Sequence, residues 1–117
     1  MNLESPTTKL FAFFFPWRQA SLVSQVGGEV ARQCRADFWQ CVCLRVAGME
    51  VAEIRGYVRA LADGFIAIEV DQVLERRRLS TALRPHVVAS AVEQLINLTV
   101  RDALSHVSPA NVRPLAA

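Results

Sequence analysis

The sequence predicts an all-α fold, a small bundle of three main helices with an aromatic N-terminal arm. Apolar residues recur every three or four positions over three long segments, which is the spacing of one face of an α-helix. No second strand is evident that could pair with the single candidate strand in the chain. The length of 117 residues also matches one ordinary domain.

Both ends of the chain are predicted to lie outside the bundle. Residues 1–9 are polar and indicate a loose N-terminus, and residues 108–117 hold two prolines without apolar periodicity, which indicates a tail. Residues 10–17 form the aromatic arm, with Pro16 near its end. We expect this arm to pack on the bundle or on another subunit.

The first helix is predicted from about Gln19 to Val46. Its buried face should comprise residues spaced by three or four positions: Val23, Val26, Val30, Cys34, Phe38 and Cys41. The pair Gly27-Gly28 costs about 1 kcal/mol per glycine relative to alanine in a helix interior. A helix that begins only after Gly28 is therefore the alternative.

The second helix is predicted to begin after Gly48. An apolar seam with alternating steps of three and four follows it: Val51, Ile54, Val58, Leu61, Phe65 and Ile68. The seam fails beyond Ile68, and Asp63-Gly64 is a turn signal just before the change. We expect either a kink near Gly64 or a second packing partner beyond it, and we rank a short strand over residues 65–70 below helix.

The third helix is predicted from about Leu83 to His106, with Pro85 in its first turn. A narrow polar stripe runs along it, and apolar residues occupy most of the remaining circumference. A helix with so much apolar surface lies at the centre of a bundle or is shared between subunits.

All three cysteines fall within one short window. On a helix, Cys41 returns to nearly the direction of Cys34 about 10 Å further along the axis, and Cys43 points to about the opposite side. Neither a disulfide nor a tetrahedral zinc site fits this geometry within one helix. We therefore expect Cys34 and Cys41 to be core residues, and Cys43 to share a second apolar patch with Trp39 and Val46.

Several classes of function lack a signal. The chain carries no nucleophile elbow, phosphate-binding loop, dinucleotide fingerprint or zinc-protease motif, so we predict no catalytic, cofactor-binding or metal-binding residue. The apolar stretch at residues 10–17 is far shorter than the roughly 20 residues that cross a bilayer, and it lacks the features of a secretory signal. We expect a cytoplasmic protein whose cysteines stay reduced.

The favoured function is a non-catalytic helical interaction or assembly domain that forms a homo-oligomer. Hydrophobic residues make up 52% of the chain, and the apolar faces of the three helices exceed what a lone bundle of this size can bury. The residues predicted to contact a partner or a second subunit are Phe11, Phe13, Phe14, Trp17, Trp39, Ile96 and Val100.

A small basic nucleic-acid-binding regulator is the first alternative. Its contacts, with nucleic acid or with an acidic partner, would be Arg76, Arg77, Arg78 and Arg84. A further set fits the residue spacing of a helix-turn-helix unit: Ala60, Gly64, Val70 and Val73. The second helix of that unit would present apolar and acidic side chains where base-reading residues are needed, and the net charge of only +2 gives little support.

A metal- or redox-sensing helical domain is the second alternative. It would use Cys41 and Cys43 together with His86 or His106 from another helix. The two histidines have no short-range ligand spacing, which gives this reading little support.

Overall fold

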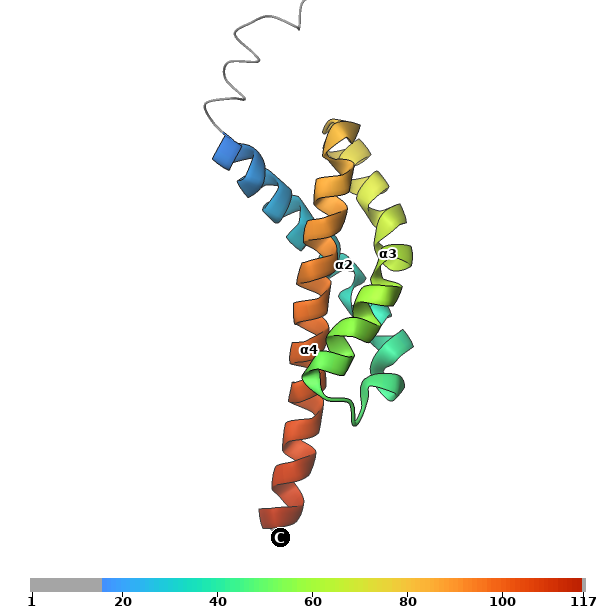
Figure 1. The fold of residues 1–117 in the computed structure, drawn as a ribbon, viewed down its shortest axis with the longest axis vertical. Helices are drawn as coiled ribbons and strands as arrows, with labels where there is room; N and C mark the ends of the chain where they lie inside the picture. Colours follow the sequence, from blue (N-terminus) through green and yellow to red (C-terminus); the bar gives the residue numbers. More distant parts are fainter. Residues whose placement is uncertain (1–15, 117) are drawn as a thin grey trace, which may run out of the picture.

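The structure, a computed structural model, describes the backbone of residues 16–116 and the side chains of residues 18–106. Three helices make up the described part of the fold: α2 (Pro16–Val46), α3 (Val51–Arg76) and α4 (Arg84–Ala116), with a short 3₁₀ turn, η1 (Thr81–Leu83), before α4 (Figure 1). The predicted all-α bundle is confirmed. Residues 1–9 and the aromatic residues Phe11, Phe13 and Phe14 lie outside the described residues, as does the side chain of Trp17.

The helices run up, down and up. Arg35 of α2 pairs with Asp102 of α4, and Gln94 of α4 bonds to Ser24 nearer the start of α2, so α2 and α4 are parallel. Between α3 and α4 the pairs Arg55–Asn97 and Arg84–Asp71 run in opposite order, so these helices are antiparallel. Helix α4 packs against both α2 and α3, which is the first of the two expected arrangements, a central position in the bundle.

The core is built from three rows of residues spaced by four positions. Each row is buried along its whole length: Val26, Val30, Cys34, Phe38, Val42 and Val46 on α2; Ile54, Val58, Ala62, Ile66, Val70 and Leu74 on α3; Val87, Ala91, Leu95, Thr99 and Ala103 on α4. Four residues turn a helix by about 400°, so such a row winds slowly around its helix. Rows of this kind interlock when helices cross obliquely, as α2 crosses α4 in Figure 1.

These rows correct two predicted faces. On α2, Cys41 is exposed and Val42 is buried in its place, because the row keeps its step of four after Phe38. On α3, three members of the predicted seam are exposed: Val51, Leu61 and Ile68. The buried row departs from the predicted seam before Ile68, because Ala62 is buried where the seam has Leu61.

Helix α3 is continuous through Gly64. The strand over residues 65–70, which ranked below helix, does not form. Gly64 is exposed, and a β-carbon built on it would meet nothing within 4 Å, so no packing demand explains this glycine.

Gly27 and Gly28 lie well inside α2, so the alternative start after Gly28 is wrong. A β-carbon on Gly27 would lie 2.5 Å from Ser90 Oγ of α4, and one on Gly28 would lie 2.9 Å from Gln94 Oε1. The glycines therefore permit α2 and α4 to approach closely where they cross.

The connections follow local chemistry. Gly48 takes the left-handed φ of 87° at the turn after α2, which favours glycine. Glu50 and Glu53 form a capping box that starts α3, and Ser80 caps η1 by accepting a hydrogen bond from the amide of Ala82. Helix α4 extends to Ala116, whereas a tail was predicted from residue 108. The sequence offers no glycine C-cap before that point, and proline can bend a helix without ending it.

Candidate interaction surfaces

The apolar residues that were predicted to contact a partner lie in different environments in the structure. Ile96 is 0% exposed and belongs to the chain's own core, so a partner could reach it only by opening the bundle. Its burial follows from the position of α4 between two helices. Trp39 and Val100 are half-buried against the core. Phe11, Phe13, Phe14 and Trp17 offer no described side chain.

Three of the four predicted contact arginines pair with carboxylates of the same chain. Arg76 and Arg77 both approach Glu29 of α2, at 3.5 and 3.2 Å. Arg84 reaches Asp71 at 2.6 Å, and its hydrogen bond lowers the pKa of that carboxyl group. Arg78 stands apart, at the exposed end of α3 with a left-handed φ of 57°.

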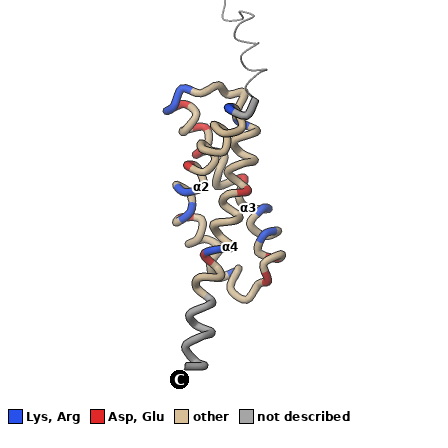
Figure 2. The backbone as a smooth tube through the Cα atoms, turned by 90° about the vertical axis from the view of Figure 1, so that its left-hand side faces the viewer, with Lys and Arg blue, Asp and Glu red and all other residues tan. Residues whose placement is uncertain are grey.

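Charge is interleaved over the described part of the molecule. In Figure 2 basic and acidic positions alternate along the bundle instead of separating into one basic face. The ion pairs also occupy groups that a phosphate backbone would have to compete for. This arrangement gives little support to a nucleic-acid surface built from Arg76, Arg77, Arg78 and Arg84.

The helix-turn-helix spacing has no structural counterpart. Ala60 and Gly64 lie in one unbroken helix, Val51–Arg76, and both are exposed. A helix-turn-helix unit would need a turn near Gly64 and a second helix packed across the first. Val70 and Val73 are buried because they face the bundle core, not a DNA-binding unit.

An apolar pocket opens where the end of α2 lies beside α4. We name it the Leu44 pocket, and its lining consists of Trp39, Cys43, Leu44, Val46, Ala47, Ala103 and His106. The expected apolar patch of Cys43, Trp39 and Val46 is thus confirmed, as one wall of this pocket. Another wall comes from α4, where the His106 ring lies against the Trp39 ring with 5.0 Å between the ring centroids and a tilt of 37° between the ring planes.

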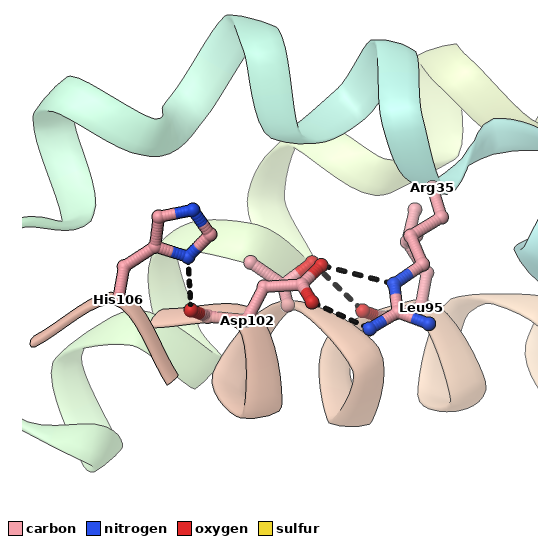
Figure 3. Close-up of polar contacts among 5 residues, drawn as sticks. Arg35, Leu95, Asp102 and His106 are labelled. Atoms are coloured by element: carbon pink, nitrogen blue, oxygen red, sulfur yellow. Dashed lines mark hydrogen bonds and ion pairs between the residues drawn. The ribbon is translucent and has the colours of Figure 1, made fainter. Parts of the chain in front are cut away.

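An ion pair holds the two helices together one turn before the pocket. Arg35 of α2 donates through Nε and Nη2 to both carboxylate oxygens of Asp102, at 3.0 and 2.5 Å (Figure 3). The main-chain carbonyl of the same Asp102 lies 2.9 Å from His106 Nδ1, which fixes the imidazole ring against Trp39. A forked arginine–carboxylate pair sets both distance and orientation, so it positions the two walls of the pocket.

The volume of the pocket suits a side chain. It encloses about 180 Å³, below the roughly 300–1,000 Å³ of typical small-molecule sites. Its polar groups are few: the Cys43 thiol points back to the carbonyl of Gln40, and Nδ1 of His106 is engaged with Asp102. The remaining lining is apolar, so the pocket can accept an apolar group but offers little chemistry for catalysis.

Leu44 at this pocket is 89% exposed. Sequence reasoning missed it, because Leu44 belongs neither to the predicted buried face of α2 nor to the predicted patch of Trp39, Cys43 and Val46. Ala47 and Ala103 were missed as well, because alanine carries no distinctive signal. One signal was present: a leucine directly after Cys43 of the expected patch that fits neither apolar face of the helix.

The cysteines separate into three environments. Cys34 is buried, its thiol donates to the carbonyl of Phe65 at 3.7 Å, and burial raises its pKa. Cys41 is exposed, and Cys43 is half-buried in the Leu44 pocket with His106. Within residues 18–106, no group of three or more histidine, cysteine, aspartate or glutamate side chains is placed to hold a metal ion.

Comparison with known proteins adds no relative: no family model, no curated protein and no solved structure matches this chain. Among the helices described, none is both long and apolar enough to cross a membrane.

Proposed function

We propose that this chain is a non-catalytic helical assembly domain that pairs with a second copy of itself through the Leu44 pocket. The observation that carries the proposal is the exposure of Leu44 beside an apolar pocket. A single exposed leucine is ordinary on a protein surface. A leucine that is 89% exposed at the edge of a pocket large enough for one side chain is a projection next to a matching hollow.

Two-fold pairing would use both features at once. In a symmetric dimer the same patch faces itself, so Leu44 of each copy can enter the pocket of the other copy. Trp39 and His106 would then form an aromatic floor for the incoming leucine. Buried aromatic and aliphatic anchors at the centre of a contact contribute most of the binding energy in protein interfaces.

The proposal replaces most of the contact residues predicted from the sequence. Trp39 is kept, Ile96 is excluded by its burial, and Leu44 becomes the central residue. The cytoplasm remains the predicted location, with support from three free thiols.

Sedimentation velocity of the full chain across a range of concentrations tests the proposal. Leu44→Lys should shift the protein towards monomer, because a charged side chain would have to enter an apolar pocket. Lysine is a good helix former and suits the last turn of α2, so the fold should be retained. Ile68→Lys is the matched control: Ile68 is 67% exposed on α3 and does not line the pocket.

The expected result is a concentration-dependent dimer for the wild type and for Ile68→Lys, and a monomer for Leu44→Lys. A wild-type chain that stays monomeric at millimolar concentration would reject self-assembly. A dimer that Ile68→Lys weakens as much as Leu44→Lys does would reject the Leu44 pocket as the contact.

A further inference from the structure

A polar groove follows the line where α2 and α4 cross. Two hollows form it, and they share Gly28, Arg32 and Gln94, so they are continuous. The remaining lining is Ser21, Ser24, Gln25, Glu29 and Arg77 in one hollow, and Arg35, Asn97, Leu98 and Arg101 in the other. Their volumes of about 730 and 400 Å³ fall within the range of small-molecule sites.

Gly28 keeps the floor of the groove open. A β-carbon there would lie 2.9 Å from Gln94 Oε1 and 3.1 Å from Arg32 Nη1. The Gln94 side chain is fixed, because its Nε2 donates to the carbonyl of Ser24 at 2.9 Å and to Ser90 Oγ at 3.0 Å. The part of the groove that is common to both hollows is therefore lined by the fixed Gln94 amide and the Arg32 guanidinium.

The groove carries positive charge that the described residues 18–106 do not neutralise. Arg35 and Arg77 are paired with Asp102 and Glu29. For Arg32 and Arg101, by contrast, no carboxylate of the described residues lies within the 4.0 Å of an ion pair. These two arginines come from different helices and line the same hollow.

The side-chain amide of Asn97 is a third donor in the same hollow. Asn97 accepts a hydrogen bond from Arg55 through Oδ1 at 3.0 Å, so its Nδ2 group remains available as a donor. Two guanidinium groups and one amide thus line a hollow whose lining includes no carboxylate. Guanidinium groups form forked hydrogen bonds with phosphate oxygens, a geometry that the ammonium group of lysine cannot reproduce.

We propose that this groove binds the phosphate group of a small anionic ligand, with Arg32 and Arg101 as its charged contacts. A small ligand is favoured over a nucleic acid because, within the side chains that the structure describes, only two arginines of the groove lack a carboxylate partner, and acidic positions interrupt the basic ones elsewhere (Figure 2). The site is separate from the Leu44 pocket, and no residue is common to the two linings.

Isothermal titration calorimetry of the full chain with pyrophosphate, and then with inorganic phosphate, tests the site at low salt. Arg32→Gln and Arg101→Gln should each weaken pyrophosphate binding by about tenfold or more, which corresponds to the loss of a charge-assisted hydrogen bond. Arg32→Lys should give a smaller loss, because it keeps the charge and removes the fork. Arg45→Gln is the matched control, since Arg45 is an exposed arginine of α2 outside the groove.

Unchanged affinity in Arg45→Gln together with loss in the two groove variants supports the site. Absence of saturable pyrophosphate binding, or an equal loss in Arg45→Gln, overturns it. A 20-nucleotide single strand that binds more tightly than pyrophosphate, and equally to wild type and Arg32→Gln, also overturns it. The Leu44→Lys variant should bind pyrophosphate like the wild type, so failure of either proposal can be told apart from failure of the other.

Discussion

Gly27 of α2 faces Ser90 of α4 so closely that no methyl group fits between them. A β-carbon on Gly27 would lie 2.5 Å from Ser90 Oγ, 2.7 Å from Ser90 Cβ and 3.0 Å from the amide nitrogen of Ala91. Two of these three atoms are not the ends of flexible chains, so they cannot move aside without moving α4. The missing side chain therefore sets how closely the two parallel helices approach.

The first prediction is that Gly27→Ala destabilises the protein. Alanine gains about 1 kcal/mol in helix propensity over glycine, but overpacking a close contact costs typically 1–3 kcal/mol and sometimes more. We expect a net loss of about 1–2 kcal/mol in the free energy of unfolding. Urea unfolding followed by circular dichroism measures it. A stabilised Gly27→Ala variant would show that the helices can separate without cost.

The second prediction concerns Gly64→Ala, which makes the same change on α3 without a neighbour. Nothing lies within 4 Å of a β-carbon at this position. We expect stabilisation by about 0.5–1 kcal/mol, because alanine loses less backbone entropy than glycine on folding. The same urea experiment measures it. A loss of stability would instead favour the turn that the sequence pattern suggested at Asp63-Gly64.

The core spacing explains how far the sequence could predict this fold. Helix number, type and approximate position were predictable, because apolar residues recur with a helical period in three segments. The buried face of α3 was not, because two apolar sets coexist there. The heptad seam includes Leu61 and Ile68, whereas the buried row passes through Ala62 and Val70. Only the oblique packing of α3 in the bundle decides between them.

The candidate site was less predictable than the fold. Trp39 and Cys43 were placed on one patch because they share a helix, and a helical period is sufficient for that. His106 completes the patch from α4, and its place depends on the parallel register that Arg35 and Asp102 fix. Contacts of this kind join residues far apart in the chain, and no local spacing encodes them. The same holds for Arg32 and Arg101 in the groove.

The third prediction is a loss of stability in acid. Arg84 lowers the pKa of Asp71, mainly through its hydrogen bond, and Arg59 lowers the pKa of Glu93 in the same way. A carboxyl group with a lowered pKa in the folded state stabilises the protein fully above its unfolded pKa, which is about 4. That contribution is lost as the pH falls through the folded pKa. The urea concentration at the midpoint of unfolding should therefore decrease as the pH is lowered from about 5 to about 3.

The double variant Asp71→Asn, Glu93→Gln isolates these two groups from the other carboxylates. Its midpoint should change less with pH over the same range, and 1 M salt should reduce the difference from wild type, because both pairs are exposed to solvent. If the two pH profiles keep the same shape, the ion pairs do not contribute to the acid transition.

The fourth prediction is an order of cysteine modification. Cys41 is exposed, Cys43 is half-buried and Cys34 is buried, and burial followed by the charges of Glu69 and Asp37 raises the pKa of Cys34. The thiolate is the reactive form, so N-ethylmaleimide should label Cys41 first, Cys43 next and Cys34 only on unfolding. Mass spectrometry of peptides after timed pulses gives the order. Early labelling of Cys34 would contradict its place in the α2 core row.

The same labelling also reports on self-assembly, because Cys43 lines the Leu44 pocket and Cys41 does not. If a second copy fills the pocket, the labelling rate of Cys43 should fall as the protein concentration rises through the dissociation constant. The rate at Cys41 should stay constant and serves as the internal reference. Leu44→Lys should abolish the concentration dependence at Cys43, because the projecting leucine that fills the partner's pocket is gone. A rate at Cys43 that does not change while sedimentation shows dimers would place the contact on another face of the bundle.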